Sequence, residues 1–139
     1  MSPATGTIVG VTSHPDPTTR RHRPPAPVDL GLVLPPFIRG GGDPTSHRAG
    51  RDWWFAWTTP AGTVTLLLTD GGGEVVASAW GDGADWILDR LPDLVGARDD
   101  PSGFVPHHDL VARGWPRLRT WRVPANGLVA QMLVCSVLE

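Results

Sequence analysis

The residues best suited to chemistry form a basic, aromatic segment in the last third of the chain. In the stretch WPRLRTWR, Trp115 and Trp121 alternate with three arginines, Arg117, Arg119 and Arg122. Aromatic rings stack on nucleobases and guanidinium groups hold phosphates, so this pattern is one that binds nucleic acid. The pattern also suits two core tryptophans covered by arginine stems, and we favour that structural interpretation. We therefore expect no more than a weak DNA contact at Arg117, Arg119 and Arg122.

A run of metal-ligating residue types, His107, His108 and Asp109, precedes this segment. Adjacent side chains on a helix point about 100° apart, so neighbours seldom bind the same ion. No second cluster supplies further ligands, and the single cysteine, Cys135, lies in an apolar run typical of a small core residue. The pattern favours the start of a surface helix, and we expect no metal site and no cofactor.

Two further patterns resemble catalytic motifs but lack their essential parts. The glycine-rich stretch RGGGDPT, residues 39–45, lacks the Gly-Lys-Ser/Thr of a phosphate loop and indicates a turn. Asp82, Asp85 and Asp89 form an acidic group, but Asp82 and Asp85 are placed to begin a helix. Because no nucleophile and base form a recognisable pair, the sequence assigns no catalytic residue.

The length of 139 residues suits one domain, or one small domain and part of another. A net charge of −2 argues against binding nucleic acid by bulk charge. No run approaches the ~20 apolar residues that span a bilayer, and the N-terminus lacks the order of a signal peptide. We expect a cytoplasmic protein without a membrane contact, and a disordered arm over residues 1–27, which are rich in Pro, Thr and Arg.

Several segments alternate apolar and polar residues with the period of a β-strand. They are residues 28–34, 51–58, 63–69 and 74–80. Short turn signals join the last three, which predicts an antiparallel meander with the first strand beside it. Within this sheet, Trp53, Trp57 and Trp80 are expected to pack against a helix that carries Trp86.

The remaining elements are expected to be helices. A helix follows Asp85, and Pro92 should kink or split it. Residues 107–114 predict a short helix that the Trp115-Pro116 pair ends. The final helix begins near Pro124 and is apolar nearly all round, which is typical of a helix buried on all sides. One small sheet cannot easily wrap such a helix, so we expect it to pack against a missing part of the polypeptide or a partner chain.

Four stretches together resemble the front part of a DNA glycosylase. They are VDLGLVLPPFIRGGGDPTSHR, WFAWTTPAGTVTLLLT, WGDGADWILDRLPDLVGARDDPSGFVPHHDLVARGWPRLR and VPANGLVAQMLVCSVLE. The family is the 3-methyladenine DNA glycosylase II type, within the helix-hairpin-helix glycosylase superfamily. The resemblance runs from about Val28 to Glu139, and so covers most of the chain.

The resemblance implies an α+β fold and a role in base-excision repair. Residues 28–100 would form an antiparallel sheet of four or five strands flanked by helices, similar to half of the TATA-binding fold. Residues 101–139 would begin an all-α domain that is incomplete here. Such enzymes act on alkylated bases in double-stranded DNA, where a carboxylate stabilises the developing sugar cation of a flipped nucleotide.

No residue of this sequence matches the family's catalytic aspartate or the hairpin that grips DNA. We therefore expect a front fragment of the glycosylase without activity alone, and whether the chain is itself an enzyme stays open. The alternative hypothesis is a non-catalytic interaction module that docks or dimerises through its apolar C-terminal helix. The residues expected to make that contact are Leu128, Met132, Leu133 and Val137.

Overall fold

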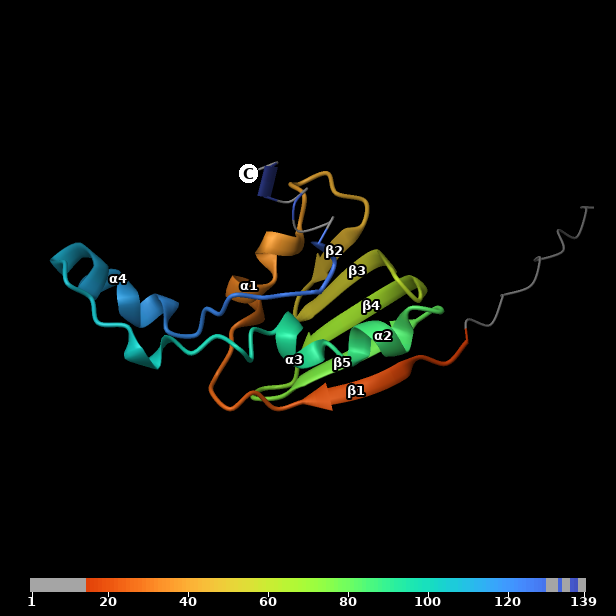
Figure 1. The fold of residues 1–139 in the computed structure, drawn as a ribbon, viewed down its shortest axis with the longest axis horizontal. Helices are drawn as coiled ribbons and strands as arrows, with labels where there is room; N and C mark the ends of the chain where they lie inside the picture. Colours follow the sequence, from red (N-terminus) through yellow and green to blue (C-terminus); the bar gives the residue numbers. More distant parts are fainter. Residues whose placement is uncertain (1–14, 130–132, 134–135, 138–139) are drawn as a thin grey trace, which may run out of the picture.

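The computed structural model describes residues 15–129, 133, 136 and 137. The described part is an α+β fold with one open, antiparallel sheet of five strands in the order β1-β5-β4-β3-β2 (Figure 1). The strands are β1 (Thr18–His22), β2 (Ser46–Ala49), β3 (Asp52–Thr59), β4 (Gly62–Asp70) and β5 (Val75–Trp80). The helices are α1 (Leu30–Val33), α2 (Ala84–Leu88), α3 (Leu91–Leu94) and α4 (Asp109–Leu118), with short 3₁₀ helices η1 (Pro35–Phe37) and η2 (Pro101–Gly103).

Strict alternation along the central strands separates a buried face from an open one. In β4, Val64, Leu66 and Leu68 are buried, whereas Thr63 and Thr65 are exposed. The buried face packs against α1, α2 and α3, and together they form one core cluster. This period-two pattern is the signal that predicted strands over 51–58, 63–69 and 74–80, and β3, β4 and β5 confirm those predictions.

The first expected strand is a helix in the structure. Residues 28–34 were expected to be a strand, but they contain α1, where the Gly31 amide donates to the carboxylate of the N-cap residue Asp29 at 2.7 Å. Leu30, Val33 and Leu34 are all buried, because their spacing fits one side of a helix as well as the alternation fits a strand. The segment forms a helix and not a strand because the Asp29 side chain caps the helix.

The expected disordered arm over residues 1–27 is wrong for Thr18–His22, which forms β1. Arg21 pairs in register with Val76 of β5, and its guanidinium donates to Glu74 at 2.8 Å. Arg20 makes an ion pair with Asp89 at the end of α2. Cross-strand backbone bonds and these ion pairs hold a segment whose own side chains are nearly all exposed, so hydrophobic patterning gave no signal for it. Residues 1–14 lie outside the described residues.

The helix after β5 is divided as Pro92 predicted, into α2 and α3. Its start is different, because Gly83 rather than Asp82 or Asp85 occupies the N-cap, and Asp85 lies in the first turn. Gly83 is required there because a Cβ would lie 2.6 Å from both the Gly62 carbonyl oxygen and the Thr59 hydroxyl. Close contact with the β3–β4 turn therefore determines the residue that begins α2.

The tryptophans divide between the two faces of the sheet. Trp53 and Trp57 are buried on the helix-covered face, as expected. Trp80 was expected there too, but it stacks on Trp54 on the open face, with ring centroids 5.8 Å apart. The register explains this, because Trp80 lies opposite the exposed Thr65 of β4.

Neighbouring leucines of β4 provide a test of the alternation. Leu66 is fully buried, so Leu66→Ala should destabilise the fold by about 3 kcal/mol through lost burial and the cavity left behind. Leu67→Ala, on the open face, should cost about 1 kcal/mol. Urea unfolding monitored by tryptophan fluorescence measures both, and equal losses would contradict the assignment of the two faces.

Candidate interaction surface

A segment without regular structure links α4 to the C-terminal end of the chain. We call residues 119–127 the strap. The Ala125 amide donates to the carbonyl oxygen of Asp93 in α3 at 2.9 Å. The Val123 amide donates to the Asp99 carboxylate, also at 2.9 Å. These bonds fix the strap to the helices that cover the sheet.

The three arginines proposed to contact DNA are not equivalent. Arg122 is buried, and its guanidinium donates to the carbonyl oxygens of Arg119 and Trp121, both at 2.7 Å. Gly96, with a φ of +73°, makes room for it, since a Cβ there would lie 2.3 Å from the Arg122 Cβ. Arg122 therefore holds the strap and is turned away from solvent, whereas Arg117 and Arg119 are exposed.

The chain between α3 and the strap projects from the body, and we call residues 100–118 the arm (Figure 1). It consists of η2 and α4, and no residue of α4 is buried. His108 caps α4 by accepting from the Leu110 amide at 3.2 Å, which gives that histidine a structural role. The Phe104 ring lies 4.4 Å from the Trp115 ring and steadies the arm.

The helix α4 is longer than expected, because it continues through Trp115-Pro116 to Leu118. Pro116 cannot donate to the Ala112 carbonyl, but Ala112 is exposed, so water can bind that oxygen. The extension adds Leu118 to the side of the helix that carries Leu110 and Val111, and all three are exposed. Leu118 was missed in the sequence because the helix was expected to end at Gly114.

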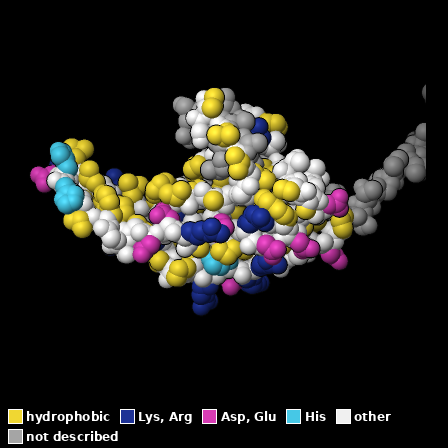
Figure 2. All heavy atoms as spheres, in the orientation of Figure 1, with side chains coloured by type: hydrophobic (Ala, Val, Ile, Leu, Met, Phe, Trp, Pro, Cys, Tyr) yellow, Lys and Arg dark blue, Asp and Glu magenta, His cyan; other side chains and the backbone are white. Residues whose placement is uncertain are grey.

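The C-terminal helix exposes an apolar stripe, which we call the C-terminal stripe. Val129, Leu133 and Val137 are helical and follow one another at intervals of four residues, with exposed fractions of 72%, 62% and 81%. Leu128 is half-buried and packs on the core. Met132, the other residue expected in this contact, lies outside the described residues. Figure 2 shows hydrophobic side chains along the arm and over the C-terminal segment.

The start of this helix is firmly anchored. The Asn126 side chain is fully buried and accepts from the Leu128 amide at 2.9 Å. Gly127 has a φ of +73° and lies against Arg90, whose guanidinium is 3.5 Å from the centre of the Trp86 ring. The first turn is thus attached to α2, while the stripe beyond it is left in solvent.

A shallow hollow of about 310 Å³ lies beside the C-terminal stripe. It is lined by Ala125, Gly127, Leu128, Val129, Leu133 and Ser136. No ionisable side chain is among these residues, so the hollow suits an apolar group and does not suit a phosphate.

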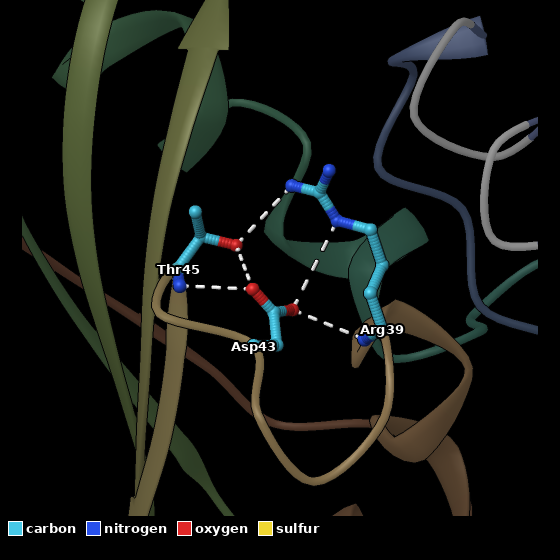
Figure 3. Close-up of polar contacts among 3 residues, drawn as sticks. All are labelled: Arg39, Asp43 and Thr45. Carbon is cyan, nitrogen blue, oxygen red and sulfur yellow. Dashed lines mark hydrogen bonds and ion pairs between the residues drawn. The ribbon is translucent and has the colours of Figure 1, made fainter.

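The glycine-rich stretch over residues 39–45 forms a closed turn built around Asp43 (Figure 3). One carboxylate oxygen accepts from the Thr45 amide at 2.9 Å and from its hydroxyl at 2.6 Å. The other accepts from the Arg39 amide at 3.0 Å. The Thr45 carbonyl in turn accepts from the Ala56 amide of β3 at 2.8 Å. The turn expected here is confirmed, and its polar groups are used within the fold.

Hydrogen bonding keeps Asp43 ionised. Burial of the carboxyl raises its pKa, but bonds from the Thr45 hydroxyl and from the Arg39 and Thr45 amides outweigh this and lower the pKa to about 2. At Asp100, hydrogen bonds from the amide and hydroxyl of Ser102 lower the carboxyl pKa. Both carboxylates therefore organise turns.

Within the part of the chain that the structure describes, no three His, Cys, Asp or Glu side chains lie close enough to hold a metal ion. None of the described helices is both long and apolar enough to cross a bilayer. Comparison of the chain with protein families, curated proteins and solved structures finds no match. The exposed apolar groups of the arm and the C-terminal stripe are accordingly the strongest functional feature of the described surface.

Removing the Asp43 carboxylate should loosen the β2–β3 side of the sheet. Asp43→Ala should destabilise the fold by about 1–2 kcal/mol, because three donors lose their acceptor. Asp82→Ala removes the same charge from an exposed site and should change stability by less than about 0.5 kcal/mol. Urea unfolding at pH 7 compares the two variants.

The same carboxylate predicts a pH dependence. Its folded pKa of about 2 lies below the ordinary aspartate pKa of 3.8, so its contribution to stability is present above about pH 4 and is lost as the pH falls toward 2. The stability difference between the natural protein and Asp43→Ala should therefore shrink over that interval. A difference that stays constant from pH 5 to about pH 2 would contradict the assignment.

Gly127→Ala should detach the first turn of the C-terminal helix. A Cβ would lie 2.9 Å from the Arg90 Nε in a backbone conformation that disfavours side chains, at a cost of about 1–2 kcal/mol. Hydrogen exchange at residues 125–129 should accelerate. Gly114→Ala is the control, because nothing lies within 4 Å of its Cβ position and alanine favours a helix. Unchanged exchange in Gly127→Ala would show that this anchor is unimportant.

Proposed function

We propose that this chain is the sheet-bearing front part of a DNA glycosylase that excises alkylated bases of the 3-methyladenine type from double-stranded DNA. In this proposal it acts in cytoplasmic base-excision repair and has no excision activity alone. The sequence resemblance is the source of the proposed activity. The α+β architecture and its five-stranded antiparallel sheet are compatible with it.

The observation that carries the proposal is the uncovered C-terminal stripe. A helix of this apolar character normally lies inside a protein, yet Val129, Leu133 and Val137 are exposed here. In the proposed enzyme, a helical region that bears the DNA-gripping hairpin and the catalytic aspartate covers the stripe. That region would supply the chemistry, while this chain supplies the sheet and part of the interface.

Two acidic residues beside a surface hollow have structural roles. Asp99 and Asp100 border a surface hollow together with Arg122. Asp99 accepts from the Val123 amide, and Asp100 accepts from the Ser102 amide at 3.0 Å. Each carboxylate thus organises the base of the arm, whereas base excision needs one aimed at the sugar of a flipped nucleotide.

A second candidate function is a non-catalytic interaction module. It rests on the same exposed stripe, read as a permanent docking surface for another protein or a second copy of this chain. Under this second function the chain has no part in base excision. This function therefore predicts that the chain will not restore excision to any added helical half of a glycosylase.

Base release from methylated duplex DNA distinguishes the two functions. The chain alone should release no 3-methyladenine above the spontaneous rate. Addition of the separately produced helical half of a 3-methyladenine-type glycosylase should restore excision if this chain completes it. Leu133→Asp should reduce the restored rate at least about tenfold, because a charge would enter the apolar contact.

The control for that experiment is Thr65→Asp, an exposed position on the open face of the sheet. It should restore excision as well as the natural chain does. Release of 3-methyladenine by the chain alone would disprove its inactivity. Excision by the helical half that is unaffected by either form of the chain would disprove the glycosylase role.

A further inference from the structure

The open face of the sheet carries a hollow beside Trp80. The hollow has a volume of about 380 Å³ and lies over the neighbouring strands β3, β4 and β5, whereas α1, α2 and α3 pack on the opposite face. The side chains that line it from the open face are those of Ala56, Thr58, Thr63, Thr65 and Trp80. All of these residues belong to the described part of the chain.

The Trp80 ring is held in place on this face. It stacks on Trp54, with ring centroids 5.8 Å apart and an interplanar angle of 19°. Trp80 is half-buried and also lines the hollow, so the stack leaves part of this residue accessible to a ligand. A ring that the protein already holds loses little entropy when a ligand packs on it. Trp80 is therefore a preorganised platform.

Threonines beside this platform have hydroxyls that the fold does not use. Thr58, Thr63 and Thr65 are exposed, and within the described residues their hydroxyls make no hydrogen bond. By contrast, the neighbouring Thr59 hydroxyl donates to the Gly62 carbonyl oxygen at 2.8 Å. Thr58 and Thr63 lie directly opposite each other in the register of β3 and β4, so the unused hydroxyls are gathered in one place.

The chemistry of the lining disfavours two kinds of ligand. No ionisable side chain lines the hollow, and Asp82, which follows the lining residue Gly81, is an exposed acid. A phosphate would therefore meet no cation and a repelling charge. A wholly apolar ligand would cover the threonine hydroxyls without giving them a partner, which costs free energy. The ligand that fits is uncharged, with one apolar face and hydroxyl groups around it.

A pyranose ring has this combination of groups. Its C–H groups form an apolar face that can pack on an indole, and its hydroxyls both donate and accept, as threonine hydroxyls do. We propose that the hollow binds a pyranose ring of an uncharged oligosaccharide, with the apolar face of the sugar on Trp80 and its hydroxyls bonded to the threonines. This site is separate from the arm and the C-terminal stripe, and it goes beyond the proposed function.

Titration of the isotope-labelled 139-residue chain with maltohexaose, cellotetraose and chitotetraose, followed by NMR, tests the site. At least one of these uncharged sugars should shift the Trp80 indole N–H and the amides of Thr63 and Thr65. The shifts should saturate with a dissociation constant of about 1 mM, because the hollow is shallow. If none of the three sugars shifts these signals at concentrations up to about 20 mM, the proposal is overturned.

Two variants remove the proposed contacts separately. Trp80→Ala removes the platform and should raise the dissociation constant at least about tenfold. Thr65→Val removes one hydroxyl with little change of shape and should raise it about three- to tenfold. The matched controls are Trp121→Ala, at a 40% exposed tryptophan of the strap, and Thr18→Val in β1, whose register partner Ala79 faces the core. Both controls should bind as the natural chain does.

The spectrum of each variant also shows whether it is folded. If Trp80→Ala does not fold, Thr65→Val decides the test alone, because its hydroxyl has no partner within the described residues. Unchanged affinity in Thr65→Val, or in a folded Trp80→Ala, would overturn the proposed contacts.

Adenosine monophosphate distinguishes a sugar site from a nucleotide site. Its base also stacks on tryptophan, but it brings a phosphate for which the hollow has no cation. It should bind more weakly than the best of the three sugars, and tighter binding at the same residues would overturn the choice of ligand. Because the excision assay does not depend on the hollow, either proposal can fail while the other stands.

Discussion

The fixed start of the C-terminal helix is the constraint on which the functional argument depends. Asn126 caps the first turn, and Gly127 lies against Arg90 and against Trp86 of α2. The first turn is therefore attached to the body, and Val129, Leu133 and Val137 are exposed. The stripe is thus presented by the fold, and a partner surface need not reorganise the body to reach it.

The body of the fold was largely predictable from the sequence because its signals are local. The alternation of apolar and polar residues predicted β3, β4 and β5, and Pro92 predicted the division between α2 and α3. Prediction failed where two periods were compatible with the same residues, as at Leu30 and Leu34, which suit a strand or a helix. It failed also for β1, because an edge strand held by pairing with β5 needs no apolar face of its own.

The candidate surface was only partly predictable, for a different reason. The apolar character of the C-terminal helix is visible in the sequence, but its exposure depends on how the strap is attached to Asp93 and Asp99. The last turn of α4 was missed because proline usually ends a helix, whereas Ala112, whose carbonyl has no donor at Pro116, is an exposed residue. In the sequence, Arg122 was grouped with Arg117 and Arg119 because of their spacing. In the structure Arg122 is buried, because Gly96 has no side chain to clash with it.

The exposed apolar groups are better explained by recognition than by an unfinished core. The inner face of the sheet is closed by α1, α2 and α3, and residues such as Leu66, Leu91 and Leu94 are already fully buried. The arm and the stripe add nothing to that closure, since no residue of α4 is buried. Apolar groups that the body does not need for burial, yet holds in fixed positions, lower the entropy cost of association. That property serves a helical half of a glycosylase, and it serves a docking partner in the same way.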